Sequence, residues 1–181
     1  MIDKTIIEES AGGNLQSFKK LVQVSSPFAF SVAFRMLGND SKASDIVQES
    51  MITVWKKIHK IKSAESYKSW LYRIVINKCY DELRKQKRNP EFTLDEKNWV
   101  AISNKIFENP SAELENREIA QVITMLTEKL SPRQKAAFIL SELEEMTNEE
   151  ISEITSMSKA NVKANLHYAR KKIADLLENH I

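Results

Sequence analysis

The stretch from residue 157 to residue 172 combines basic and hydrogen-bonding side chains at helical spacing. Val162, Leu166 and Ala169 recur at four and three residues, which predicts one buried face of a helix. Outside that face lie the polar side chains Lys159, Asn161, Lys163, Asn165, His167, Tyr168, Arg170 and Lys171. Such a helix can bond phosphates and base edges in the major groove, so the stretch predicts DNA binding. The alternative is an ordinary basic surface helix.

A second polar stripe lies on a predicted helix over residues 66–88. Its members are spaced four, four, three and four residues apart: Arg73, Asn77, Asp81, Arg84 and Arg88, with Lys85 and Lys87 beside them. Aromatic side chains lie close by in sequence, at Tyr67, Trp70, Tyr72 and Tyr80. Basic residues interleaved with aromatic rings suit unstacked bases as well as phosphates. For Trp70 the apolar neighbours favour a place in the core instead.

A third set of side chains combines acidic and apolar groups on a predicted helix over residues 40–60. Its members step by three and four residues: Asp45, Gln48, Glu49, Ile52 and Lys56. Carboxylates beside an exposed isoleucine are more typical of a protein-docking face than of a nucleic-acid-binding one. A solvated helix face is the alternative for this set.

No pattern in the sequence indicates catalysis. His59, His167 and His180 are not spaced as ligand pairs with each other or with Cys79, the one cysteine. There is no Gly-rich phosphate loop, no Ser-His-Asp arrangement and no pair of carboxylates in a recognisable motif. The sequence therefore predicts a protein that is not an enzyme, with no catalytic residue, no metal site and no cofactor.

The elements that must position these residues are expected to be helices. Three Gly and four Pro among 181 residues are too few for the turns of an all-β fold. In the N-terminal half, start and stop signals predict four helices. They begin near Asn14, at Ser26-Pro27, at Asn39 or Asp40, and near Ser66, and the second ends at Leu37 before Gly38.

The C-terminal half carries its own set of helix signals. Helices are predicted from Ser111 to about Lys129, from Ser131-Pro132 to about Leu143, from Asn148 to Thr155, and from Ser158 to about Glu178. Thr147 and Glu150 form a capping box before the third of these. A short helix, a tight turn and a longer basic helix make a helix-turn-helix layout. The proline-bounded, acidic residues 90–110 predict a flexible linker between two small helical domains, so the fold class is all-α.

Charge is unevenly distributed along a chain whose net charge is only +2. Residues 1–89 hold 16 basic and 9 acidic side chains, residues 90–116 hold 2 and 6, and residues 117–181 hold 9 and 10. Two separate basic segments, 56–88 and 157–172, indicate a polyanion contacted at two places. The single cysteine suits a reducing cytosol, and the sequence predicts neither a signal peptide nor a membrane span.

Three stretches together resemble the extracytoplasmic function group of bacterial RNA polymerase sigma factors. Residues 35–49 (RMLGNDSKASDIVQE) resemble the signature leading into that family's polymerase-binding helix. Residues 69–78 (SWLYRIVINK), continued by 81–88, resemble its minus-ten helix. Residues 130–134 (LSPRQ) with 148–170 resemble its C-terminal helix-turn-helix. The resemblance implies sigma region 2 at residues 10–89, a linker at 90–110 and sigma region 4 at 111–178.

The resemblance also implies partners and residue roles. The chain would bind core RNA polymerase, promoter DNA and an anti-sigma protein, in the cytoplasm and without membrane insertion. Core polymerase would be bound by Asp45, Gln48 and Glu49. The minus-ten DNA would be contacted by Arg73, Asn77, Asp81, Arg84, Lys85 and Arg88. The minus-thirty-five DNA would be contacted by Lys159, Lys163, Ala164, His167, Tyr168, Arg170 and Lys171.

Two other functions fit parts of the sequence. A conventional helix-turn-helix regulator that binds duplex DNA as a dimer would account for residues 130–178 but would leave the first ninety residues without a role. A helical adaptor that binds only protein would account for the acidic face. Copurification with core polymerase distinguishes a sigma factor from the regulator, and salt-sensitive nucleic-acid binding excludes the adaptor.

Overall fold

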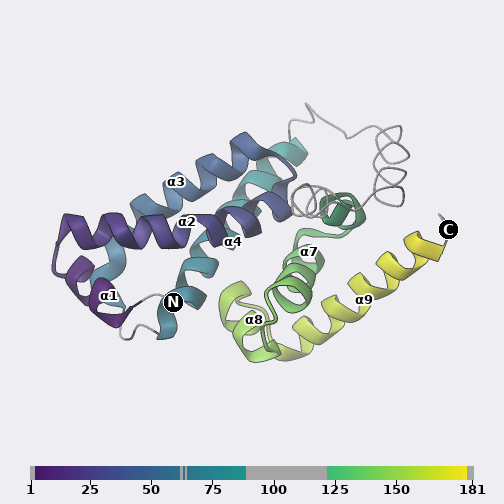
Figure 1. Cartoon of the computed structure of the whole chain (residues 1–181). Helices are drawn as coiled ribbons and strands as arrows, with labels where there is room; N and C mark the ends of the chain where they lie inside the picture. Colours follow the sequence, from purple (N-terminus) through teal and green to yellow (C-terminus); the bar gives the residue numbers. More distant parts are fainter. Residues whose placement is uncertain (1–2, 62, 64, 89–121, 179–181) are drawn as a thin grey trace, which may run out of the picture.

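The structure, a computed structural model, describes residues 3–61, 63, 65–88 and 122–178, and every regular element in these ranges is a helix (Figure 1). The all-α fold class predicted from the scarcity of Gly and Pro is therefore confirmed. The helices fall into an N-terminal and a C-terminal domain. The predicted linker at 90–110 and the predicted start of the second domain at residue 111 lie outside the described residues.

The N-terminal domain consists of α1 (Lys4–Ala11), α2 (Leu15–Leu37), α3 (Asp40–Lys57) and α4 (Glu65–Arg88), with a 3-10 turn at Ile58–Lys60. Side-chain caps define two starts: Asn14 accepts hydrogen bonds from the backbone of Gln16 and Ser17, and Asn39 accepts one from Lys42. Gly38 ends α2 in the left-handed conformation with φ of 66°. A β-carbon at Gly38 would also lie 2.6 Å from the Thr124 side chain, so only glycine fits there.

Two features of this domain differ from the sequence-based prediction. Ser26-Pro27 does not start a helix, because α2 runs without a break from Leu15 to Leu37 with Pro27 inside it. The turns before and after the proline bury side chains in the same core, Leu21 on one side and Val32 on the other, which offsets the lost backbone hydrogen bond. Helix α1 was not predicted; it is capped by Asp3 and buries Ile7.

The C-terminal domain has a helical segment at residues 122–126, followed by α7 (Pro132–Phe138), a π-helical turn η2 (Ile139–Leu143), α8 (Asn148–Thr155) and α9 (Lys159–Glu178). Capping boxes at Ser131 with Gln134 and at Thr147 with Glu150 define the starts of α7 and α8, as predicted. The single helix predicted from residue 132 to about 143 changes to π geometry after Phe138. The π turn brings Glu144 out of the helix and toward the N-terminal domain.

One apolar core joins the two domains, with α4 at its centre. Leu71, Val75 and Ile76 of α4 are completely buried, and they belong to the same cluster as Ile151 and Ile154 of α8. Helix α4 contacts α2 and α3 within its own domain and α7 and α8 of the other (Figure 1). The position of α4 therefore decides the position of both domains.

A carboxylate that is mostly shielded from solvent lies at this junction. Glu144, only 12% exposed, accepts a hydrogen bond of 2.9 Å from the Arg35 guanidinium and one of 2.5 Å from the Tyr72 hydroxyl. Burial, and then the bond donated to Glu144, raise the pKa of Tyr72 well above its usual value. The next residue, Glu145, has a positive φ of 54°, so the backbone turns sharply to place this carboxylate. The Glu144 contact holds α2, α4 and the C-terminal domain together.

Replacing Glu144 by Ala is expected to lower the free energy of unfolding by about 2 kcal/mol, because hydrogen bonds to charged groups contribute roughly 1.5–3 kcal/mol. The measurement is urea unfolding followed by circular dichroism. Glu153→Ala is the matched control, since Glu153 is exposed on α8. Equal stability of the two variants would show that the Glu144 carboxylate does not hold the domains together.

Candidate nucleic-acid and protein interfaces

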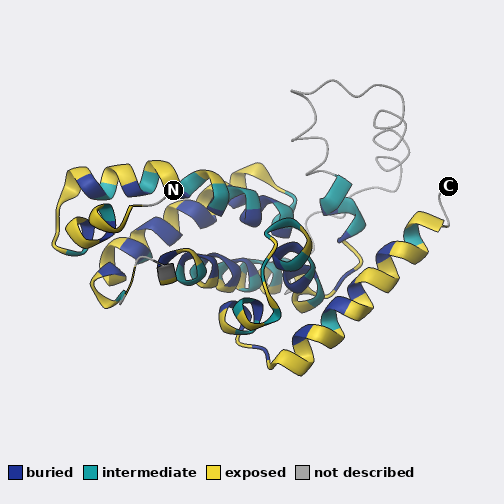
Figure 2. Cartoon of the chain, turned by 60° about the horizontal axis from the view of Figure 1, so that its bottom comes forward, coloured by how far each residue is buried: buried dark blue, intermediate teal, exposed yellow. Residues whose placement is uncertain are grey.

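Helix α9 presents the predicted DNA-binding side chains on its outer surface. Val162, Leu166 and Ala169 are buried at 0–4% exposure, so the predicted inner face is confirmed. All seven predicted contact residues are exposed: Lys159, Lys163, Ala164, His167, Tyr168, Arg170 and Lys171. Figure 2 shows that the last helix, which leads to the C-terminus, is exposed along most of its surface. These side chains of α9 are therefore accessible to a partner at the surface of the domain.

The turn before α9 uses a residue other than glycine. Ser156 adopts the left-handed conformation with φ of 58°, which costs a residue with a β-carbon roughly 1–2 kcal/mol. The Ser152 hydroxyl donates a 2.6 Å hydrogen bond to the Met157 carbonyl across this turn, and the Met157 side chain is buried. These contacts offset the strain and fix the angle between α8 and α9.

Two cations of α9 are paired with carboxylates from the acidic segment 141–153. Lys159 lies 2.7 Å from Glu149, and the Arg170 guanidinium lies 2.6 Å from Glu142. The cationic side chains are more than half exposed, and ion pairs in such positions stabilise a protein by about 1 kcal/mol or less. A DNA phosphate can therefore replace either carboxylate at small cost.

The polar stripe on α4 is also exposed at Asn77, Asp81, Arg84 and Lys85. Arg84 forms a 2.7 Å ion pair with Asp81 one turn earlier. Arg73 is exposed as well, but its guanidinium donates a 3.3 Å hydrogen bond to Ser156 in the turn between α8 and α9. Arg88 ends α4, and its side chain lies outside the described residues. The stripe is thus brought together as predicted, with Arg73 engaged by the other domain.

The aromatic side chains beside this stripe are arranged differently from the prediction. Tyr67 and Tyr72 are completely buried, and Tyr67 shares a 3.0 Å hydrogen bond with Ser25. They belong to the core and cannot stack on bases. Trp70 is half-buried and packs against the same core, which agrees with the interpretation favoured from its neighbours.

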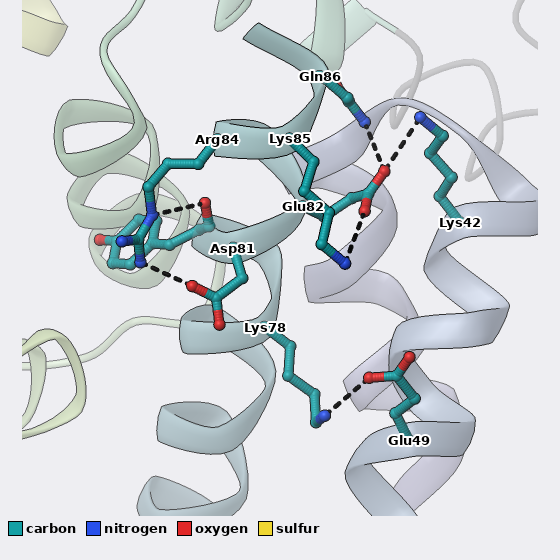
Figure 3. Close-up of polar contacts among 9 residues, drawn as sticks. Lys42, Glu49, Lys78, Asp81, Glu82, Arg84, Lys85 and Gln86 are labelled. Carbon is teal, nitrogen blue, oxygen red and sulfur yellow. Dashed lines mark hydrogen bonds and ion pairs between the residues drawn. The ribbon is translucent and has the colours of Figure 1, made fainter. Parts of the chain in front are cut away.

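The acidic face of α3 lies next to the stripe on α4. Asp45, Gln48 and Glu49 are exposed, and Ile52 beside them is 54% exposed. Figure 3 shows the cross-helix contacts, in which Lys78 of α4 reaches Glu49 of α3 at 2.8 Å. Lys78 is a functional candidate that sequence analysis missed, because its partner is 29 residues away and no local spacing predicts the pair.

Two kinds of site were searched for in the described ranges and not found. No three His, Cys, Asp or Glu side chains there are grouped so that they could hold a metal ion. Among the same residues, no helix combines the length and apolar character needed to cross a membrane.

Comparison with known proteins shows that each of the two domains contains a segment matched by a family model. The family model described as "Sigma-70 region 2" matches residues 21–89, and that described as "Sigma-70, region 4" matches residues 120–173. The sigma factor SigV of Bacillus subtilis (strain 168) is 30% identical over 78% of this chain and 80% of its own length. The ECF RNA polymerase sigma factor SigW of the same bacterium is 26% identical over 99% of this chain and 98% of its own.

This chain belongs to the ECF subfamily of sigma-70 factors. Two solved structures share its fold. One is CnrH in complex with the cytosolic domain of CnrY, with a TM-score of 0.69, 21% identity and 99% coverage of both chains. The other is RpoE with the anti-sigma factor NepR from Bartonella quintana, with a TM-score of 0.66, 20% identity and coverage of 91% of this chain and 98% of that one. At these identities the two structures support the fold alone.

The lowered pKa values of two carboxylates in region 4 of this sigma factor predict that the protein loses stability in acid. The bond from Arg170 lowers the pKa of Glu142, and the backbone N–H of Thr147 lowers that of Glu150. Because the folded pKa values lie below the unfolded value of about 4.3, their stabilisation is complete above that pH. The free energy of unfolding is therefore expected to fall as the pH drops below about 4. Urea unfolding between pH 3 and 7 measures this fall. Glu142→Gln and Glu150→Gln should each make the fall shallower. An equally steep fall in both variants would show that these two carboxylates do not cause the loss of stability in acid.

Proposed function

We propose that this sigma factor uses three exposed faces for the three contacts of transcription initiation: α3 for core RNA polymerase, α4 for the opened minus-ten region and α9 for the minus-thirty-five duplex. The function of binding core polymerase, directing it to promoters and assisting promoter opening follows from its family. The assignment of faces rests on one observation. Apart from Arg88, whose side chain lies outside the described residues, each candidate set of side chains is exposed on a single helix, and the residues of each set lie within a segment that a sigma-70 family model matches.

The docking face on α3 is proposed to consist of Asp45, Gln48 and Glu49, with Ile52 beside them. Their exposure beside an apolar side chain supports this role, because an interface core excludes water around apolar groups while charged groups at its rim set the orientation. A cationic partner surface on the polymerase would complement the two carboxylates.

The minus-ten face is proposed to be the exposed stripe on α4. Asn77 carries no charge and can pair with the edge of a base that has left the stack, and its exposure supports this role. The basic side chains would bind nearby phosphates, and Asp81 would orient Arg84 through their ion pair. The full set is Arg73, Asn77, Asp81, Arg84, Lys85 and Arg88. Because Arg73 donates a hydrogen bond to Ser156, using it for DNA requires the Arg73 guanidinium to give up that bond.

The minus-thirty-five face is proposed to be the outer surface of α9. Lys159 lies at its first turn, where the backbone N–H groups of the helix N-terminus would also favour a bound phosphate. Lys163, Ala164, His167, Tyr168, Arg170 and Lys171 follow along the same helix and would read or hold the major groove. The domain bounds that go with these faces are residues 10–89 for region 2, 90–110 for the linker and 111–178 for region 4.

Further consequences follow from this role. The sigma factor is a regulatory subunit, and we assign it no catalytic activity and no cofactor. We place it in the cytoplasm, because the polymerase and the chromosome that it would contact are there. An anti-sigma protein that covers α3 or α4 would hold it inactive.

The test of the function is run-off transcription of genomic DNA fragments with purified core polymerase, followed by mapping of start sites. Added protein should produce new, defined starts, and the protein should copurify with core polymerase. Binding to duplex DNA without any new start and without core polymerase would instead favour the conventional helix-turn-helix regulator.

Reversing both Asp45 and Glu49 to Lys is expected to weaken binding to core polymerase at least tenfold, because each change turns attraction into repulsion at the docking face. Affinity is measured by fluorescence anisotropy of labelled protein titrated with core polymerase. Lys57 and Lys60 reversed to Glu serve as a matched control, because both are exposed at the end of α3 and in the turn after it and neither belongs to the docking face. Unaltered affinity of the first variant, with a native circular dichroism spectrum, would remove α3 from the interface.

Substitutions on the two DNA faces are expected to affect different steps, promoter opening for α4 and duplex binding for α9. Asn77→Ala should impair promoter opening more than duplex binding, because its neutral amide contributes only once a base has left the stack. Lys163→Ala should weaken duplex binding, at a cost of roughly 1–3 kcal/mol if it contacts a base. Permanganate footprinting measures opening, and gel shifts on promoter duplex measure binding. Normal opening by the Asn77 variant at saturating protein, or unchanged duplex binding by the Lys163 variant, would contradict the corresponding assignment.

A further inference from the structure

A charged groove lies between α3 and α4, where the proposed polymerase-docking and minus-ten faces meet. Its volume is about 530 Å³, and only Ile46 among its lining residues is apolar. The cations lining it are Lys42, Lys78, Arg84 and Lys85, and the carboxylates are Asp45, Glu49, Asp81 and Glu82. Figure 3 shows that Lys42 and Glu49 of α3 reach across it to Glu82 and Lys78 of α4.

Two ion pairs cross this groove, and only one of them includes a residue of a proposed functional face. Lys42 of α3 lies 3.1 Å from Glu82 of α4, and neither residue belongs to a proposed functional face. Lys78 of α4 lies 2.8 Å from Glu49 of α3, and Glu49 belongs to the proposed docking face. Lys78 also follows Asn77 directly on the proposed minus-ten helix. The Glu49–Lys78 pair therefore connects the two proposed faces through one salt bridge.

We propose that Lys78 is a further promoter-binding residue whose charge is neutralised by Glu49 until core polymerase takes that carboxylate. The proposal rests on the docking role assigned to Glu49. When Glu49 accepts a hydrogen bond from a cationic group of the polymerase, Lys78 loses its counterion. The α4 surface then gains one positive charge, and a backbone phosphate of the promoter strand supplies the missing partner.

The geometry suits an exchange of partners. The Lys78 side chain is 25% exposed, so it is half-buried but still partly accessible to solvent. Glu49 is 60% exposed, so a partner protein can reach its carboxylate. An ion pair this exposed is worth about 1 kcal/mol or less, so either partner can be replaced without unfolding the bundle. Binding at one face must then favour binding at the other by the same factor, because such coupling is reciprocal.

Three variants test the proposal: Lys78→Met, Lys78→Arg and Lys42→Met. The last is a matched control, because it removes the other cross-groove cation and leaves Glu82 its contacts with Lys85 and Gln86. The probe is a duplex carrying a start site mapped in the run-off experiment, bound by holoenzyme at several salt concentrations. Affinity of each variant for core polymerase alone is measured separately.

Lys78→Met is expected to weaken promoter binding by the holoenzyme and to lower its salt slope by about 1, as the loss of one phosphate contact requires. The affinity of this variant for core polymerase should be unchanged or up to about fivefold tighter, because Glu49 no longer has to break its ion pair with residue 78 before it binds the polymerase. Lys78→Arg should keep the salt slope, and Lys42→Met should behave as the unaltered protein in both measurements.

Opposite outcomes would overturn the proposal. An unchanged salt slope for Lys78→Met would exclude a phosphate contact. Weaker core binding by that variant, or an equal effect of Lys42→Met, would show a structural or general electrostatic role. Failure of the proposed function is distinguishable, because the unaltered protein would then neither bind core polymerase nor produce a start site.

Discussion

Burial of α4 on two sides is the constraint on which the rest of the structure depends. Leu71, Val75 and Ile76 form the centre of a core to which both domains contribute. A helix enclosed in this way has only a narrow surface left for polar residues. The stripe containing Asn77 and Asp81 occupies that surface, so the core that holds the domains together also determines which polar side chains of α4 stay exposed.

Two classes of polar contact surround α4, and they differ in strength. Glu144 is nearly enclosed and receives hydrogen bonds from Arg35 and Tyr72, so separating these groups leaves charged groups partly buried. The pairs on the outer surfaces, such as Arg170 with Glu142, are exposed and exchange partners at small cost. The domain junction is thus held by contacts that are costly to break, whereas the outer surfaces carry contacts that exchange partners at small cost.

The arrangement also explains how a protein with a net charge of +2 can carry basic faces. Its carboxylates lie within reach of the cations that would bind DNA, as in Lys159 with Glu149 and Arg170 with Glu142. Each such pair reduces attraction to phosphate in the free protein. Under the proposed assignment of faces, a promoter would displace these carboxylates. DNA with several phosphates positioned for the cations would then bind more tightly than DNA making a single contact.

The sequence by itself determined the local features of this protein. Helix starts at Asn14, Asn39, Ser131 and Thr147, the stop at Gly38 and the inner face of α9 depend on residues no more than a few positions apart, so their patterns could be recognised directly. The tertiary structure decided the rest. Pro27 stays inside α2 because both halves of that helix pack on one core, and Tyr67 and Tyr72 are buried where the sequence placed them only near a polar stripe. Glu49 meets Lys78 and Glu144 meets Arg35 across 29 and 109 residues of chain, and such pairs exist only because packing brings their helices together.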